Sequence, residues 1–495
     1  MGEVTSTEPL IGPGGLLLLG LYLASLIVIG VFGRMARKSN TLGDFFLGGR
    51  SFGFFVLLLT LYATQYSGNT LIGFAGKSYR TGFSFLISIA FMMGVIGVYL
   101  VFAPKLYRLS REEGFVTLGD YIQHRFKNRT LTVLISISGI VALCNFLITN
   151  LKAIGEITGE VTGGVVSPAM GIAVLAVIII IYETLGGLRS VAWTDVIQGL
   201  MLFFGVTIIF SAVIASLGGL ENVTARLHEV RPDFWEAPGP SQIVTWISTL
   251  IVISVGIALY PQAIQRIYAA KDSQTLRRAL TVMVFMPLLT TILMVSIGVL
   301  ANIPFPGLSK AESEGATVIM LQNVADVFPS LTWIIILFVG AVLAAIMSTA
   351  DSAMLSIASS VTRDLIQPFK EQITEASLTL FGKGFSWIVM TVATILAIIL
   401  PQSIWALAEI KLELLVQCAP ALLLGINSDR LEAKSVLAGF IAGMTVTLFF
   451  LLGAFFHEVI PKRPYGVHAG IWGLILNLIV ITFAHHFSKR QAAQA

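Results

Sequence analysis

Residues 63–70 read Ala-Thr-Gln-Tyr-Ser-Gly-Asn-Thr, a polar run with a glycine inside an apolar stretch that covers residues 54–74. A second apolar stretch, 243–263, contains Gly256 and then the run Tyr260-Pro261-Gln262. Interrupted backbone survives inside a bilayer only where it lines a cavity or is buried in protein, because lipid offers no hydrogen-bond partners. Paired interruptions of this kind indicate the midplane binding site of a transporter. Ordinary kinked helices are the alternative, since glycine and proline are common in membrane helices.

The whole chain of 495 residues is apolar, with a mean hydropathy of +0.88 and only 12% charged residues. A soluble protein carries about twice that fraction of charge. A membrane-spanning helix needs about 20 mostly apolar residues, and such stretches recur along the sequence. We therefore predict an all-α integral membrane protein that forms a single domain, residues 1–495.

Thirteen transmembrane helices are expected. They lie at roughly 16–32, 54–74, 83–102, 131–151, 169–181, 191–217, 243–263, 280–300, 333–357, 385–399, 404–424, 436–452 and 471–484. The two interrupted stretches are the second and the seventh. Because they are five spans apart, they cross the membrane in opposite directions, as the two halves of an inverted repeat do.

An odd number of spans places the two ends of the chain on opposite sides of the membrane. Most of the 31 Lys and Arg residues fall in segments that are cytoplasmic if the N-terminus is outside. Basic loops stay on the cytoplasmic side. We therefore expect a multi-pass protein of the plasma (inner) membrane, with the N-terminus outside and the C-terminus in the cytoplasm. These loops also explain the net charge of +4, so the lipid bilayer is an expected partner and nucleic acid is not.

The ninth span carries small and hydroxyl side chains along one face, at Ala345, Ser348, Thr349, Ser352, Ser356 and Ser359. Such a stripe can bind an ion or line a water path, and close helix packing is the alternative. Asp195 and Asp351 are the carboxylates nearest the apolar interior, where a charge is expensive and a partner is expected. Asp195 could also cap or snorkel at its helix end. Lys411, Glu409 and Glu413 are expected to form a structural ion pair. No nucleophile–base pair or metal-binding cluster is visible, so an enzyme is not expected.

Four motifs resemble those of the sodium:solute symporter family, in the same order and on the corresponding spans. They are Leu47-Gly48-Gly49-Arg50-Ser51, the run Gly186–Asp195, Arg266 followed by Ala269-Ala270-Lys271-Asp272, and the run Ala345–Ser352. The resemblance implies a five-plus-five inverted-repeat (LeuT-type) core at about residues 53–425. Peripheral helices would then lie at about 14–33, 434–455 and 468–487.

The resemblance also implies ion sites. A sodium site would use the backbone carbonyls of Ala63, Tyr66 and Ala345 with the hydroxyls of Ser348 and Thr349, and oxygen ligands suit this hard cation. A second ion site would map to Asp195, Asp351 and Ser352, together with Ser348, although the two-sodium members have serine at the position of Asp351.

Substrate candidates face the two interruptions. They are Gln65, Ser67, Gly68, Asn69, Asn145, Tyr260 and Gln262. Gln65 stands where the proline symporters have an aspartate, and Asn69-Thr70 matches neither the proline nor the sugar symporters.

We therefore predict a sodium-coupled symporter that imports a small organic solute by alternating access. The solute is expected to bear a carboxylate, as a monocarboxylate, pantothenate or an amino acid does. Na+ is the expected cofactor, and the protein is expected to be a monomer or a homodimer. The alternative is a proton-coupled carrier or a channel-like protein that uses Asp195 and Asp351.

Overall fold

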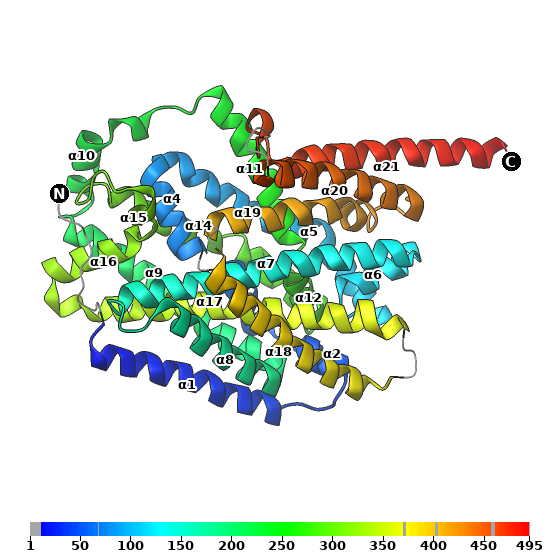
Figure 1. Ribbon diagram of the computed structural model, residues 1–495, viewed down its shortest axis with the longest axis horizontal. Coiled ribbons are helices and arrows are strands. Elements are labelled where there is room, and N and C mark those ends of the chain that lie inside the picture. Colours follow the sequence, from blue (N-terminus) through cyan, green and yellow to red (C-terminus); the bar gives the residue numbers. More distant parts are fainter. Residues whose placement is uncertain (1–10, 68, 370–372, 401–403, 457–460, 495) are drawn as a thin grey trace.

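The computed structural model describes residues 11–67, 69–369, 373–400, 404–456 and 461–494, and most of these are helical (Figure 1). The α-helices are α1 Pro13–Met35, α2 Leu42–Leu47, α3 Phe54–Gln65, α4 Phe74–Thr81, α5 Ile87–Glu113, α6 Leu118–Phe126, α7 Arg129–Val161, α8 Pro168–Gly186, α9 Leu188–Ser216, α10 Leu220–Val230, α11 Pro240–Ala258, α12 Pro261–Ala269, α13 Ser273–Met283, α14 Met286–Leu300, α15 Lys310–Glu314, α16 Ala316–Val327, α17 Trp333–Ser360, α18 Glu375–Ile399, α19 Ile404–Leu415, α20 Ala433–Phe456 and α21 Ala469–Gln494. Shorter turns include η2 Asn69–Gly73, η8 Val416–Cys418 and η9 Pro420–Leu424.

Eleven helical segments among the described residues are long and apolar enough to cross a membrane. Each of them covers much of one predicted span, so the prediction of a multi-span all-helical protein is confirmed. The two predicted spans not among them are 54–74 and 404–424, which consist of short consecutive helices rather than one long helix. The count of thirteen therefore stays a prediction.

Both interrupted stretches are broken helices. Helix α3 ends at Gln65, and Tyr66 is extended, with φ −98° and ψ 128°. Helix α11 ends at Ala258, and α12 begins at Pro261. Proline has no amide to continue the hydrogen-bond ladder, and it disfavours helical geometry in the residue before it. The ψ of 124° at Tyr260 reflects that effect.

Helix α17 lies at the centre of the fold. Every residue from Phe338 to Ser360 is buried, and the helix packs on α3, α7, α9, α12 and α18. In contrast, α1 lies along one side of the molecule and α20 and α21 along the other (Figure 1). Helix α1 exposes Leu17, Leu18 and Leu21. A helix that is apolar and buried all round belongs to a core, whereas exposed leucines on a spanning helix face lipid.

The contact between α4 and α14 generates a prediction about stability. A methyl group on Gly298 would overlap the carbonyl oxygen of Ala75 and the hydroxyl of Ser78. Overpacking of this kind costs about 1–3 kcal/mol. We expect Gly298→Ala to lower the midpoint of thermal unfolding of the purified protein. Gly20→Ala is the matched control, because nothing lies within 4 Å of the added methyl group. Equal midpoints for both variants would contradict this packing.

Candidate functional site

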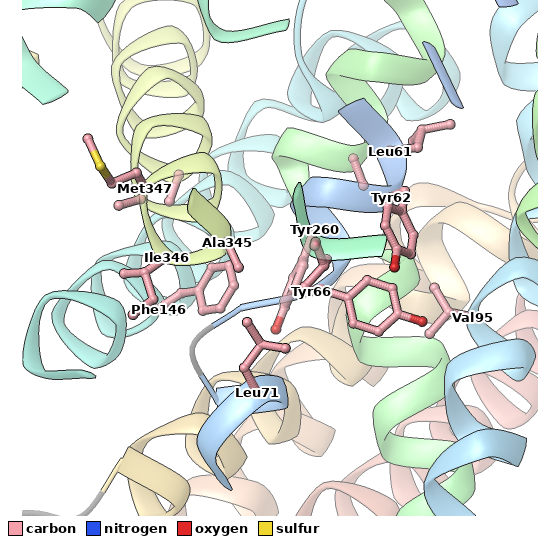
Figure 2. Packing of buried hydrophobic residues seen from close by; sticks show 14 of the residues in the cluster. Leu61, Tyr62, Tyr66, Leu71, Val95, Phe146, Tyr260, Ala345, Ile346 and Met347 are labelled. Carbon is pink, nitrogen blue, oxygen red and sulfur yellow. The ribbon is translucent and has the colours of Figure 1, made fainter. Parts of the chain in front are cut away.

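Side chains from four helical regions meet at the two breaks. Figure 2 shows Tyr260 between Phe146 and Tyr66, with Leu71 close by and Ala345 on the neighbouring helix. The ring centroids of Phe146 and Tyr260 are 5.2 Å apart, and those of Tyr62 and Tyr66 are 4.8 Å apart. The breaks in α3 and α11–α12 thus lie together, although the sequence separates them by nearly two hundred residues.

The residues predicted to bind sodium are distributed over α3 and α17, which pack on each other. The Thr349 hydroxyl lies 3.0 Å from the Ala345 carbonyl oxygen. The Ser348 hydroxyl donates to Asp195 Oδ1 at 2.5 Å. Because α3 ends at Gln65, the Ala63 carbonyl lies in the last turn, where no following helical amide is available. Sequence reasoning missed Asn150 on α7, whose Oδ1 lies 2.9 Å from the Thr349 hydroxyl. An amide side chain inside a predicted span was the available signal.

Asp195 lies in a fully buried ion pair. Its Oδ2 is 2.8 Å from Arg266 Nη2, and neither side chain is exposed. The same guanidinium donates to the Ser352 hydroxyl at 2.6 Å and to the Thr60 hydroxyl at 2.8 Å. The interpretation of Asp195 as a capping or snorkelling residue is therefore wrong. Sequence reasoning found Arg266 only as part of a motif, and it missed Thr60.

Asp351 has different partners. Its Oδ2 accepts from the Tyr182 hydroxyl at 2.5 Å, and its Oδ1 accepts from the Ser352 hydroxyl at 3.1 Å. Both Asp351 and Tyr182 are fully buried. Asp195, Asp351 and Arg266 thus form a buried cluster of two carboxylates and one guanidinium. This cluster carries a net charge of −1 when both carboxylates are ionised. Since an uncompensated charge in a membrane interior is costly, the cluster is suited to taking up a cation or a proton.

Several predicted substrate residues carry polar atoms that are buried without a hydrogen-bond partner among the described residues. These atoms are Gln65 Oε1, Asn145 Oδ1 and both amide atoms of Gln262. The Gln65 amide nitrogen donates to the Met92 carbonyl at 3.1 Å. Buried polar atoms are normally paired, so these unpaired amide atoms are suited to binding a polar ligand.

The remaining substrate candidates lie on or beside the first break. Ser67 is buried and lies between α3 and η2, and its amide is 3.4 Å from the Thr70 hydroxyl. Asn69 begins η2. Gly68 and the side chain of Asn69 lie outside the described residues.

A buried ion pair joins the motif Gly186–Asp195 to α2, which ends where the motif Leu47–Ser51 begins. Arg189 Nη2 donates to Asp44 Oδ1 at 2.8 Å and to the Gly48 carbonyl at 3.1 Å. Burial works to raise the pKa of the Asp44 carboxyl. Hydrogen bonds from Arg189 and from the backbone amides of Ser39 and Lys38 oppose this and bring that pKa below its ordinary value. The carboxylate is therefore ionised at neutral pH and ties the loop before α3 to the start of α9.

The Asp195–Arg266 pair generates a prediction. Arg266→Met leaves a buried carboxylate without its cation, which typically costs about 3–5 kcal/mol. We expect a clearly lower midpoint of thermal unfolding, and we expect Asp195→Asn in the same chain to recover much of the loss. Arg277→Met, at an exposed site, is the control. A double variant no more stable than Arg266→Met alone would argue against this pairing.

The sequence profile of the sodium:solute symporter family matches residues 45–443. The sodium/pantothenate symporter of Haemophilus influenzae is 28% identical over 93% of this chain and 96% of that protein. The high-affinity proline transporter PutP of Bacillus subtilis is 27% identical over 88% of this chain and 92% of that protein. The sodium/pantothenate symporter of Escherichia coli is 26% identical over 94% and 95%, respectively.

Solved structures share the fold. A Na+-coupled sialic acid symporter, in a substrate-bound outward-open state, superposes with a TM-score of 0.79 at 20% identity, over 96% of this chain and 98% of that chain. Mhp1, a nucleobase-cation-symport-1 family transporter in a closed conformation, gives a TM-score of 0.55 at 14% identity, over 90% and 94%. The family match covers most of the chain. The chain belongs to the sodium:solute symporter family, and is a sodium-coupled solute transporter rather than an enzyme.

Proposed function

We propose that this symporter imports a small organic carboxylate together with sodium, by alternating access. The observation that carries the proposal is the meeting of two broken helices beside α17, together with buried, unpaired amide atoms on Gln65, Asn145 and Gln262. Sodium takes part as a co-substrate, which corrects its description as a cofactor. Relatives named for pantothenate and proline support a carboxylate-bearing solute.

The proposed sodium site consists of the carbonyls of Ala63, Tyr66 and Ala345 and the hydroxyls of Ser348 and Thr349. The hydrogen bonds of the two hydroxyls support this assignment. Ser348 donates its proton to Asp195, and Thr349 has acceptors in Asn150 and in its own helix. A hydroxyl that donates its proton elsewhere presents its oxygen lone pairs to a cation. Sodium bound here would join α3 to α17.

The proposed second ion site uses Asp195, Asp351 and Ser352. The charge deficit of the cluster supports it, since Arg266 can neutralise only one of the two carboxylates. The cation there is a second sodium ion or a proton. If the protein is proton-coupled instead, the proton would bind Asp351, because Asp195 is already paired with the Arg266 guanidinium.

Alternating access requires a closed path on one side of the site. Gln265 on α12 accepts a hydrogen bond from Ser356 and donates one to Ser359, both on α17. We assign this contact to the cytoplasmic path, which opens when α12 and α17 separate. One charge moving through 100 mV supplies about 2.3 kcal/mol to drive the cycle.

The proposal includes the arrangement in the membrane. We assign thirteen spans, a five-plus-five inverted-repeat core at about 53–425, and a monomer or homodimer in the plasma membrane. The N-terminus is assigned to the outside and the C-terminus to the cytoplasm. Basic residues support this orientation, since Arg34 lies in the last turn of α1 and Arg37 and Lys38 follow it.

Transport itself provides the first test. Purified protein in liposomes is expected to accumulate one of a panel of radiolabelled carboxylates under an inward sodium gradient, and not under an equal potassium gradient. Uptake that needs no sodium but stops when the exterior is made alkaline would favour the proton-coupled alternative. Sodium-driven uptake of only uncharged solutes would refute the carboxylate assignment.

The sodium site provides a second test. Ser348→Ala or Thr349→Ala removes one ligand oxygen, and we expect each to raise the sodium concentration for half-maximal thermal stabilisation about tenfold, equivalent to ~1.4 kcal/mol. Ser211→Ala is the matched control, because that exposed hydroxyl donates to the carbonyl of Thr207 in its own helix. An unchanged sodium requirement in both variants would refute the assigned site.

A further inference from the structure

Lys411 on α19 is buried, with only 3% of its surface exposed. Its ammonium nitrogen lies 3.5 Å from the centroid of the Phe146 ring and 5.7 Å from that of the Tyr260 ring. The Tyr260 ring lies next to Tyr66, at the break after α3, and the Phe146 ring lies on the other side of Tyr260 (Figure 2). When it is protonated, the lysine therefore brings a positive charge to the aromatic part of the proposed substrate site.

The structure pairs Lys411 with no carboxylate in the part of the chain it describes. Glu413, its predicted partner, instead bonds through Oε1 to His468 Nδ1 at 2.8 Å and through Oε2 to the Gly470 amide. The expected ion pair between Lys411 and Glu413 is therefore wrong, because the Glu413 carboxylate bonds to His468 and to the Gly470 amide instead. The side chain of Glu409 lies outside the described residues.

The backbone around Lys411 lies beside the breaks. Helix α19 packs on α7, α11 and η2. Leu412, the next residue, packs close to Gly256 near the end of α11. A methyl group added to Gly256 would lie 3.1 Å from the Leu412 side chain. The ammonium and the two rings thus form one cluster beside the breaks.

Stability alone does not account for a lysine at this place. A cation over an aromatic ring gains about 2 kcal/mol or more when it is desolvated. Removing an ammonium from water costs several kcal/mol even after the protein relaxes. An ionisable side chain inside a membrane protein with no charged partner is therefore expected to serve function.

We propose that the Lys411 ammonium binds the carboxylate of the transported solute. This inference rests on the proposed function and narrows it. The solute carboxylate lies against the ammonium, and its uncharged part packs on Phe146 and Tyr260. An amino acid would bring its own ammonium to the same region, where Lys411 repels it. The favoured substrates are therefore monocarboxylates without an amino group.

The experiment compares thermal stabilisation of three purified full-length proteins in constant NaCl: the unchanged chain, Lys411→Met and Lys411→Arg. The probes are the choline salts of propionate, lactate and pantothenate, each paired with its uncharged amide or alcohol: propionamide, lactamide and pantothenol. Proline and alanine represent zwitterions. We expect at least one carboxylate to stabilise the unchanged chain, with its uncharged partner and the zwitterions having at most one tenth of its potency.

Lys411→Met is expected to raise the half-maximal concentration of that carboxylate at least tenfold while keeping the shift produced by sodium alone. Lys411→Arg should retain part of the response, because it keeps the charge. Lys105→Met is the matched control, since this exposed lysine bonds to Asn427 away from the site.

Two results would overturn the assignment of Lys411. One is an unchanged carboxylate response in Lys411→Met. The other is that the unchanged chain is stabilised equally by carboxylates and their uncharged partners, or is stabilised by no carboxylate. This second result needs no variant, so it tests the assignment even if Lys411→Met does not fold. If sodium alone does not raise the unfolding midpoint of the unchanged chain, that result counts against the proposed sodium coupling instead. A failure of the Lys411 assignment and a failure of the proposed function are therefore distinguishable.

Discussion

The backbone of a membrane protein has to satisfy its own hydrogen bonds, and the rest of this structure follows from that constraint. A helix can be interrupted inside the bilayer only where protein or enclosed water replaces lipid around the exposed amides and carbonyls. The breaks after Gln65 and after Ala258 meet this requirement because they lie near each other and beside α17, which is buried on all sides from Phe338 to Ser360. Freed carbonyls next to a hydroxyl stripe provide the oxygen ligands that sodium prefers.

Charge is distributed unevenly in the same interior. Around Asp195 and Asp351 there are two carboxylates and one guanidinium, so this cluster is short of positive charge. Lys411 has the opposite imbalance when it is protonated, because its ammonium lies near two aromatic rings. A symporter for a sodium ion and an organic anion has to hold one ligand of each sign. In our proposals, each ligand neutralises the local charge that the protein leaves uncompensated.

Sequence reasoning succeeded where the signal is local. The apolar spans and their two interruptions depend on residues within one helix length, and the structure has helices and breaks at those places. It failed for side-chain partners. Asp195 could be identified as an interior carboxylate, but nothing in its span indicates that Arg266 neutralises it. Glu413 is two residues from Lys411, so an ion pair is a natural expectation, yet Glu413 bonds to His468, which lies 55 residues later and directly before α21.

The sequence by itself determined the membrane class, the approximate spans and the two interrupted helices, because hydropathy, proline and glycine act on the backbone nearby. It also indicated the family, through the resemblance of four short motifs. Only the tertiary structure decided which polar groups meet. Arg266 and Asp195 are 71 residues apart, and Tyr182 and Asp351 are 169 apart. Such pairs form when helices pack with particular faces together, and the rotation of each helix about its axis depends on all of its neighbours at once. The position of Lys411 against Phe146 and Tyr260 is a result of the same packing.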